Sequence, residues 1–252
     1  MNEPRLRIAN LTKRFGALVA SDNLSLDIAR GELHAVIGPN GAGKTTLIAQ
    51  LTGQLKPDAG SIEFNGADIT ALATPARAAL GLARSFQITS VLKEFTALDN
   101  VALAVQAHQG HSFRFWRAAR GQAQLYDPAR ALLADVGLAK RAFVPAANLS
   151  HGEQRQLEIA MALAGDPSLL LLDEPTAGMG PDETAHMIAY LKTLKGRRSI
   201  LLVEHDMDAV FALADRITVL VYGRAIATGT PEEIRQNRDV RQAYLGDEAA
   251  HA

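Results

Sequence analysis

The stretch HAVIGPNGAGKTTLIAQL, residues 34–51, constrains the fold of this chain more than any other part of its sequence. It combines a short apolar strand, a glycine-rich turn and a helical pattern, and residues 38–45 fit the phosphate-loop pattern G-x-x-x-x-G-K-[ST] in full. Backbone N–H groups can turn inward around phosphate oxygens only where no Cβ intrudes, which accounts for Gly38, Gly41 and Gly43. A glycine-rich turn without a ligand is the plainer interpretation, but the flanking strand and helix are those that the motif requires.

This loop predicts a site for a nucleotide and its metal ion. The helix that begins near Lys44 adds the positive end of its dipole, and the Lys44 ammonium supplies a cation to the β and γ phosphates. The Thr45 hydroxyl is placed to bind Mg²⁺, so ATP and Mg²⁺ are the expected ligands. The residues expected to contact the nucleotide are Gly38, Pro39, Asn40, Gly41, Ala42, Gly43, Lys44, Thr45 and Thr46.

The composition argues against several other classes of protein. The 26 Lys and Arg residues and 27 Asp and Glu residues leave a net charge of -1, so no nucleic-acid partner is expected. The sequence has no cysteine, which removes disulfides, thiolate zinc sites and thiol nucleophiles and fits a reducing compartment. The N-terminus lacks the apolar core of a signal peptide, and no apolar run approaches the ~20 residues that cross a bilayer. We therefore expect any work at a membrane to depend on docking.

Strand and helix patterns alternate along the chain. Short β-type runs occur at RLRIANL, LSLDIA, ELHAVIG, SIEFNG, SLLLLD, SILLVEH, RITVLVYG and RAIATG. Helical patterns cover residues 44–54, 128–137, 150–165, 182–195 and 206–213. The alternation predicts an α/β core with a parallel sheet. The fold class expected for the whole chain is a P-loop NTPase core with a mixed sheet. The first ~35 residues and residues 60–66 are expected to add an N-terminal antiparallel β layer.

The region after residue 86 interrupts this alternation. It is mostly helical, rich in alanine and poor in β-branched residues, and β-type runs return only after it. We therefore expect a single domain over residues 1–252, in which the returning strands complete one sheet. The core and β layer are expected in 1–86 and 166–252, and an inserted α-helical lobe in 87–165.

A pair of carboxylates follows the most apolar strand candidate, in SLLLLDEP. Asp173 is expected to hold Mg²⁺ through water, and Glu174, one residue closer to the γ-phosphate, to activate a water molecule as general base. An acidic turn at a strand end is the ordinary alternative, and the phosphate loop favours the catalytic one.

Two single residues complete the expected site. His205 follows the buried strand SILLV and should emerge at the same sheet edge as Asp173, where it can donate to the γ-phosphate or position the water. Gln87 lies where the core meets the lobe, so its amide is expected to bridge Mg²⁺ or water and to sense movement of the lobe. A locally bonded histidine and a surface glutamine are the ordinary alternatives.

These residues, in this order and spacing, resemble the ATP-binding cassette family over nearly the whole chain. The matching segments are GPNGAGKTT (Walker A), SFQ (Q-loop), LSHGE (signature), LLLLDEP (Walker B), AGMGP (D-loop) and VEHD (H-loop). The resemblance implies an ABC nucleotide-binding domain with ATPase activity, in which Phe15 stacks on adenine. A loop phenylalanine buried for packing is the alternative at that position.

The signature segment NLSHGEQRQLEIA also has a local interpretation. Ser150 and Glu153 are spaced as a capping box at the start of a helix. The resemblance implies that Ser150, His151, Gly152 and Glu153 complete the ATP site of a second cassette arranged head to tail. Capping and phosphate binding both use the Ser150 hydroxyl, so we expect the loop to reorganise when the dimer closes.

Three positions depart from the usual family pattern. His151 and Glu153 replace the usual Gly and Gln of the signature, and Gly180 stands where the D-loop usually places Asp. Without the aspartate side chain at position 180, we expect the coupling between this loop and the Walker A segment of the partner to be weaker or to use other contacts.

Several segments are similar to the ATPase subunits of branched-chain amino acid uptake systems. They are RSFQ, FTALDNVALA, the insertion holding FRFW, LSHGEQRQLEIAMAL and the ending GTPEEIRQNRDVRQAYLGDE. The resemblance implies a second ATPase subunit, identical or paralogous, two transmembrane permease subunits and, indirectly, a periplasmic binding protein. It places the chain peripherally at the cytoplasmic face of the inner membrane, with a permease helix docked near residues 87–100. Uptake of branched-chain or related amino acids is the function this implies.

Three alternatives carry less support from the sequence. A lipopolysaccharide-export ATPase has a similar C-terminal ending, but the insertion around Trp116 and the sequence RSFQ before the lobe argue against it. A soluble cassette ATPase of DNA repair or translation usually carries tandem cassettes or long coiled-coil insertions, and the sequence has neither. A P-loop kinase or GTPase accounts for neither the signature nor the long separation between Lys44 and Asp173.

Overall fold

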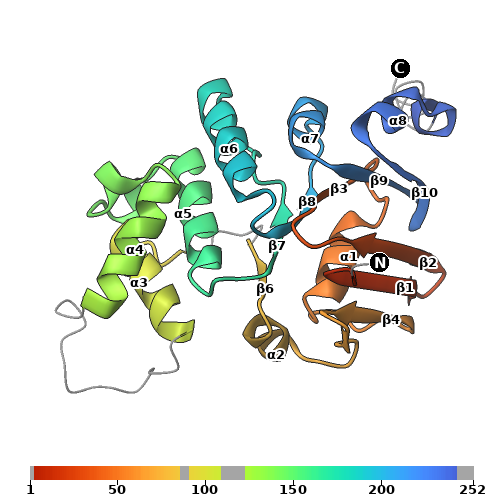
Figure 1. Ribbon diagram of the computed structural model, residues 1–252, viewed down its shortest axis with the longest axis horizontal. Helices are drawn as coiled ribbons and strands as arrows, with labels where there is room; N and C mark the ends of the chain where they lie inside the picture. Colours follow the sequence, from red (N-terminus) through yellow and green to blue (C-terminus); the bar gives the residue numbers. More distant parts are fainter. Residues whose placement is uncertain (1–2, 86–90, 109–122, 243–252) are drawn as a thin grey trace.

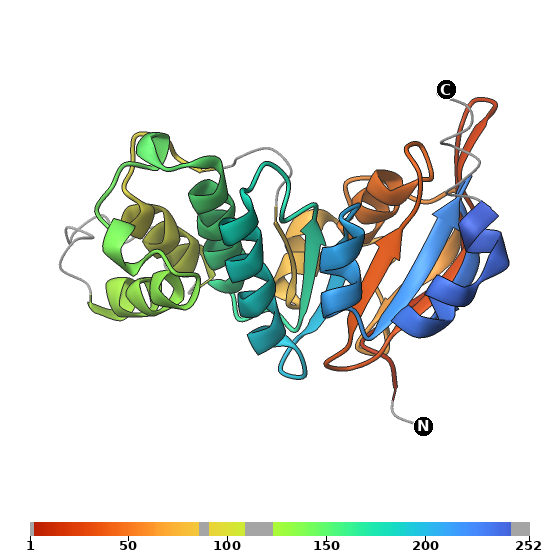
Figure 2. The same cartoon turned by 90° about the horizontal axis from the view of Figure 1, so that it is seen from above.

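The computed structural model describes residues 3–85, 91–108 and 123–242. Its strands form two sheets, and a group of helices lies at the opposite end of the molecule from the antiparallel sheet (Figures 1 and 2). The antiparallel sheet has the order β2-β1-β4-β5. Its strands are β1 (Leu6–Phe15), β2 (Leu18–Ile28), β4 (Ala59–Phe64) and β5 (Ala67–Asp68).

The second sheet is mixed and has the order β10-β9-β3-β8-β7-β6. The strands from β9 to β6 pair in parallel, and β10 pairs antiparallel with β9. Its strands are β3 (Leu33–Ile37), β6 (Leu82–Arg84), β7 (Leu169–Asp173), β8 (Ser199–Val203), β9 (Arg216–Val221) and β10 (Arg224–Gly229). The mixed sheet, the antiparallel layer and the helical group confirm the predicted fold class.

The central strands are buried on both faces, which explains their unbroken apolar sequences. All five residues of β7 are buried. Leu170 and Leu172 pack in the cluster that includes the helical group, whereas Leu169 and Leu171 pack with the antiparallel sheet. Successive side chains of a strand point to opposite faces, so each strand serves both layers.

Helix α1 (Lys44–Leu51) follows the loop after β3 and connects the two sheets through its packing. Leu47, Ile48 and Leu51 are fully buried in one cluster with residues of both sheets. The burial of this helix fixes the position of the loop at its N-terminus, which begins directly after the buried end of β3.

The helical group consists of α3 (Ala97–His108), α4 (Ala123–Asp135) and α5 (His151–Leu163). Val101, Leu133 and Leu157, one from each helix, belong to the same cluster as Leu170 of β7. The remaining helices are α2 (Thr74–Ala79), α6 (Pro181–Leu194), α7 (Met207–Leu213) and α8 (Pro231–Gln236). The proposed residue limits of core and lobe stay a prediction.

Helix α4 differs from its predicted span of residues 128–137. It begins five residues earlier, at Ala123, and contains Pro128 in its interior. Leu125 and Tyr126, which precede the proline, are buried, and the Tyr126 hydroxyl donates to Asp99 of α3 at 2.9 Å. Tertiary packing therefore continues the helix across a residue that removes one backbone hydrogen bond.

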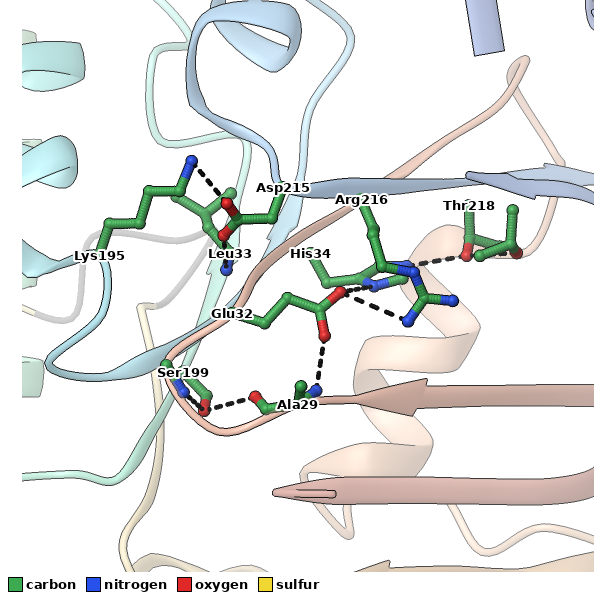
Figure 3. Close-up of polar contacts among 11 residues, drawn as sticks. Ala29, Glu32, Leu33, His34, Lys195, Ser199, Asp215, Arg216 and Thr218 are labelled. Atoms are coloured by element: carbon green, nitrogen blue, oxygen red, sulfur yellow. Dashed lines mark hydrogen bonds and ion pairs between the residues drawn. The ribbon is translucent and has the colours of Figure 1, made fainter. Parts of the chain in front are cut away.

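A buried polar network ties the start of β3 to its neighbours, at the end of the strand far from the phosphate loop (Figure 3). The ring of His34 is fully buried, with Nδ1 2.8 Å from Glu32 Oε1 and Nε2 2.8 Å from Thr218 Oγ1 of β9. Glu32 also accepts from the Ala29 amide at 2.6 Å and lies 3.6 Å from the Arg216 guanidinium. The network joins the end of the antiparallel layer to the mixed sheet.

Candidate active site

The phosphate loop is held in place by the chain's own backbone. A Cβ on Gly43, whose φ is +103°, would lie 2.3 Å from the Ala20 carbonyl oxygen of β2. A Cβ on Gly38 would lie 2.2 Å from the Leu220 carbonyl oxygen of β9, whereas a Cβ on Gly41 would meet open space. Two of the three loop glycines are therefore required by packing between the sheets and the loop, a reason that the motif alone does not reveal.

The Lys44 side chain turns back over this loop. Its Nζ donates to the carbonyl oxygens of Gly38 at 2.5 Å and Pro39 at 3.1 Å. Burial lowers the pKa of Lys44, and the carboxylates of Glu174 and Asp173 oppose that shift. The predicted phosphate cation and the two predicted acidic residues therefore share one electrostatic environment.

Asp173 and Glu174 occupy different surroundings at the end of β7. Asp173 is buried, and its Oδ2 is 3.0 Å from the Arg84 guanidinium at the end of neighbouring β6. Glu174 has a φ of +49° and its amide donates to the Val203 carbonyl of β8 at 2.8 Å. The unusual backbone conformation turns the chain sharply after the strand, which separates a buried carboxylate from a partly exposed one.

His205 lies beside Glu174, because the two residues follow β8 and β7, which are neighbouring parallel strands. Its Nδ1 is 3.6 Å from Glu174 Oε1 and 3.5 Å from Glu204 Oε2. Glu204 is buried and accepts hydrogen bonds from the Thr176 hydroxyl and, at 2.8 Å, from the His205 amide. The Glu204 carboxylate thus joins the loops after β7 and β8, a role that the position of Glu204 within VEHD does not indicate.

A second unpredicted residue supports the far end of α1. Arg77 is 1% exposed, yet its guanidinium pairs with backbone carbonyls rather than with a carboxylate. It donates to Gln50 and Leu51 at the C-terminus of α1, at 2.7 and 2.8 Å. Its other two hydrogen bonds go to the carbonyls of Thr70 and Leu72. A cation at this end of the helix complements the dipole whose positive end faces the phosphate loop.

The signature residues begin α5 with the predicted capping box. The Ser150 hydroxyl accepts from the Glu153 amide at 3.1 Å, and Glu153 Oε2 accepts from the Ser150 amide at 2.9 Å. Glu153 also pairs with Arg141 at 2.8 Å, which gives a structural reason for an acid at this signature position. Ser150 and His151 are exposed, whereas Gly152 is buried against Glu183 of α6.

The remaining predicted residues are distributed as follows. Phe15, at the end of β1, is half exposed, and the Lys13 ammonium lies 5.7 Å from its ring centre. Asn40 and Thr45 are exposed around the loop. Gln87 lies outside the described residues. Among the described residues, no hydrogen bond or ion pair joins the signature segment 150–153 to the phosphate loop.

The described part of the chain contains no helix that is long and apolar enough to span a bilayer. The sequence matches the ABC transporter family over residues 21–177. Residues 226–250 match a second family model, described as a branched-chain amino acid ATP-binding cassette transporter.

Two curated relatives cover nearly the whole chain. The high-affinity branched-chain amino acid transport ATP-binding protein LivG of Salmonella typhimurium is 40% identical over 256 residues, covering 98% of this chain and 100% of LivG. The similarly described BraF of Pseudomonas aeruginosa is 39% identical over 254 residues, with the same coverage of both chains.

Solved structures of ATP-binding cassettes share the fold. A nucleotide-free cassette from an ABC transporter has a TM-score of 0.84 at 31% identity, covering 96% of this chain and 98% of that one. The ADP conformation of a cassette gives 0.85 at 31% identity, covering 97% and 100%. A dimeric cassette bound to ADP and Pi, only 24% identical, shares the fold with a TM-score of 0.77 and coverage of 90% and 98%. The resemblance predicted from the motifs is confirmed, and the chain belongs to the ABC transporter family as an ATP-binding cassette.

Proposed function

We propose that this chain hydrolyses ATP to energise the uptake of branched-chain or related amino acids by an ABC importer. The observation that carries the ATPase part of the proposal is that the Glu174 and Asp173 carboxylates, which lie at the end of β7, act on Lys44 of the phosphate loop and oppose the lowering of its pKa by burial. The transport function assigned by name to LivG and BraF, at 39–40% identity over nearly full length, supports the choice of substrate class.

The Lys44 ammonium is proposed to exchange its two loop carbonyls for the β and γ phosphates of ATP. Both acceptors are carbonyl groups of the loop itself, so the ammonium already lies over the loop that is proposed to hold the phosphates. The backbone N–H groups of the loop, which Pro39 lacks, and the positive end of the α1 dipole are proposed to bind the same phosphates. Phe15, half exposed at the end of β1, is available to stack on the adenine ring.

The residues near the phosphate loop fit Mg²⁺. The Thr45 hydroxyl and the Asp173 carboxylate are the hard oxygen donors that this ion prefers, with the Gln87 amide as the third predicted ligand. Asp173 Oδ2 is already held by Arg84 at 3.0 Å, which fixes the direction of the carboxylate. When bound, Mg²⁺ supplies positive charge that neutralises the phosphates during the reaction.

Glu174 is the proposed general base. Its carboxylate is partly exposed, so it can accept a proton from the attacking water, whereas Asp173 is buried in an ion pair. His205, 3.6 Å from Glu174, is proposed to orient that water or to donate to the γ-phosphate.

The signature residues are proposed to act in trans. Among the described residues, no hydrogen bond or ion pair joins them to the phosphate loop of their own chain, and a second cassette, identical or paralogous, is proposed to complete each site. In a head-to-tail dimer, Ser150, His151, Gly152 and Glu153 would face the ATP held by the partner's phosphate loop. Two permease subunits and a periplasmic binding protein complete the proposed importer, with this chain peripheral at the cytoplasmic face of the inner membrane.

One feature supports a permease docking near the start of α3. Leu92 and Phe95, which precede α3, are 49% and 45% exposed, although both are large and apolar. A permease helix with apolar side chains would fit this exposed pair. A cavity of about 300 Å³ lies elsewhere, between β6, α2, α5 and the C-terminal end of α3, where Ala104, Ala107 and His108 line it.

Reconstitution in vesicles tests the function as a whole. The chain is combined with its permeases and binding protein, and leucine uptake is measured with ATP hydrolysis. Phe95→Ala should uncouple the two, lowering uptake while the ATPase activity of the isolated chain persists. Ile226→Ala, an exposed apolar change on β10 at the other end of the molecule, is the matched control. ATP hydrolysis that no branched-chain amino acid stimulates, with no uptake, would contradict the proposed function.

A further inference from the structure

Glu183, in the first turn of α6, touches both the signature and the loop that precedes its own helix. Its Oε1 accepts a hydrogen bond from the Ser150 hydroxyl at 3.1 Å, and its Oε2 accepts from the Gly180 amide at 3.1 Å. One carboxylate therefore connects the start of α5 to the segment where the family pattern usually places an aspartate.

The carboxylate also fills the space beside Gly152. A Cβ on Gly152 would lie 2.5 Å from the carboxylate carbon and from one oxygen of Glu183. Gly152 belongs to the first turn of α5, where unpaired amides and the helix dipole favour an anion. A negative charge of this chain thus occupies the side of the helix start where the proposed function places a phosphate.

The direction of the hydrogen bonds identifies what competes with that phosphate. The Ser150 oxygen accepts from the Glu153 amide, while the hydroxyl proton is donated to Glu183. A phosphate oxygen needs the proton, because it is itself an acceptor. Capping and phosphate binding are therefore compatible at Ser150, contrary to the expectation from sequence, and the competitor is Glu183.

We propose that Glu183 is a positioning residue that holds the Ser150 hydroxyl in the free subunit and yields it to the γ-phosphate of ATP carried by a second cassette. The inference rests on the proposed function, because it requires the signature to act in trans. When Ser150 is released, Glu183 Oε1 loses its hydrogen bond, while Oε2 of the same carboxylate still accepts from the Gly180 amide. Phosphate binding at the signature therefore changes a contact of the loop before α6.

A variant that removes the negative charge of Glu183 but keeps its size and a hydrogen-bond acceptor separates this role from a purely structural one. Glu183→Gln keeps an acceptor for the Gly180 amide or for Ser150 but removes the negative charge. In a Glu174→Gln background, which removes the proposed general base and should therefore slow hydrolysis, dimer formation is followed by light scattering as ATP is added. The half-maximal ATP concentration should fall roughly two- to tenfold, the range expected when a competing charge leaves a helix N-terminus.

Asp182→Asn is the matched control, because it removes an exposed carboxylate from the same helical turn. Because no hydrogen bond joins Asp182 to Ser150 among the described residues, Asp182→Asn should change the half-maximal ATP concentration by less than about twofold relative to the Glu174→Gln parent. Glu183→Asp, whose shorter side chain withdraws the carboxylate from Ser150, provides a second variant and should also lower the ATP requirement. Unfolding midpoints show that each variant is folded.

The outcomes distinguish the two proposals. If the Glu174→Gln chain forms ATP-dependent dimers and both Glu183 variants need the same ATP concentration as that parent, the role of Glu183 is overturned and the proposed function stands. If the Glu174→Gln chain forms no dimer with itself or with a paralogous cassette, both are overturned.

Discussion

The buried carboxylate of Glu204 accepts a hydrogen bond from the Thr176 hydroxyl, which joins the loop after β7 to the loop after β8. These loops carry Glu174 and His205, the residues proposed to handle the attacking water. Because each loop is held by the other, the spacing between base and histidine depends on a contact that touches neither the nucleotide nor the water.

Thr176→Val tests this dependence. The change keeps the shape of the side chain but leaves a buried carboxylate oxygen with one hydrogen bond fewer, which should cost about 1–3 kcal/mol of unfolding free energy. ATP turnover should fall while ATP affinity is retained, because the phosphate loop is unaffected. Thr193→Val, at an exposed position of α6, is the control and should change stability by less than about 0.5 kcal/mol. Denaturant unfolding and steady-state ATPase assays measure both effects, and equal behaviour of the two variants would refute the role.

Gly43→Ala and Gly41→Ala should differ in stability although both lie in the phosphate loop. A Cβ at residue 43 would collide with the Ala20 carbonyl oxygen, so we expect a loss of about 2–4 kcal/mol. The same change at residue 41 meets open space and should cost about 1 kcal/mol, from its left-handed backbone alone. Chemical denaturation without nucleotide gives the comparison, and equal losses would show that the two sheets do not fix the loop.

Arg77→Met should destabilise the protein strongly, although Arg77 lies at the opposite end of α1 from the phosphate loop. The change leaves carbonyl groups at the helix C-terminus without their buried donor, a loss of about 3 kcal/mol or more. Arg130→Met removes an exposed guanidinium from α4 and should change stability by less than about 1 kcal/mol. Thermal and denaturant unfolding compare the two, and a neutral result for Arg77→Met would contradict the capping role.

The network around Glu32 predicts a specific response to acid. Burial raises the pKa of Glu32, but hydrogen bonds from His34 and the Ala29 amide outweigh it, with Arg216 adding to their effect, so the net pKa lies below the ordinary 4.5. A pKa that is lower in the folded than in the unfolded state contributes stability above the unfolded value, and this contribution is lost as the pH falls through the folded pKa.

Glu32→Gln should therefore reduce stability at neutral pH and flatten its decline between about pH 5 and pH 3. Glu63→Gln, at a partly exposed position of β4, should leave the slope close to that of the parent. Unfolding free energies at a series of pH values provide the test. An unchanged slope for Glu32→Gln would mean that the network is not a source of acid sensitivity.

Local patterns were sufficient to predict most of the fold. The eight predicted strands correspond to eight of the ten observed, because each is a short apolar or alternating run with a clear end. Strands β5 and β6 and helices α2 and α8 were missed, since two to six residues carry too little periodicity to stand out. Helix α3 lies in the region expected to be mostly helical, but no limits were predicted for it. The start of α4 was misplaced because packing of Tyr126 against α3 outweighs the breaking effect of Pro128.

The candidate site likewise contains residues that local motifs predict and residues that only the tertiary structure reveals. The loop residues around Lys44, the acidic pair after β7 and the capping box at Ser150 are readable because their chemistry is set by fixed spacing. Glu183, Glu204 and Arg77 act through partners that are distant in sequence, so no spacing signals them. Only the fold brings these contacts together.

A mixing experiment tests the central claim, that a second cassette completes each ATP site, most directly. Lys44→Ala removes the phosphate cation, and Ser150→Asp keeps a good helix cap while placing a negative charge toward the partner's γ-phosphate. Each variant alone should show almost no ATPase activity. Mixed in equal amounts, they should recover roughly a quarter of the parental rate, because half of the random two-fold dimers are mixed and each of these has one complete site. A mixture as inactive as its components, or a Ser150→Asp chain that hydrolyses ATP at the parental rate by itself, would contradict the claim.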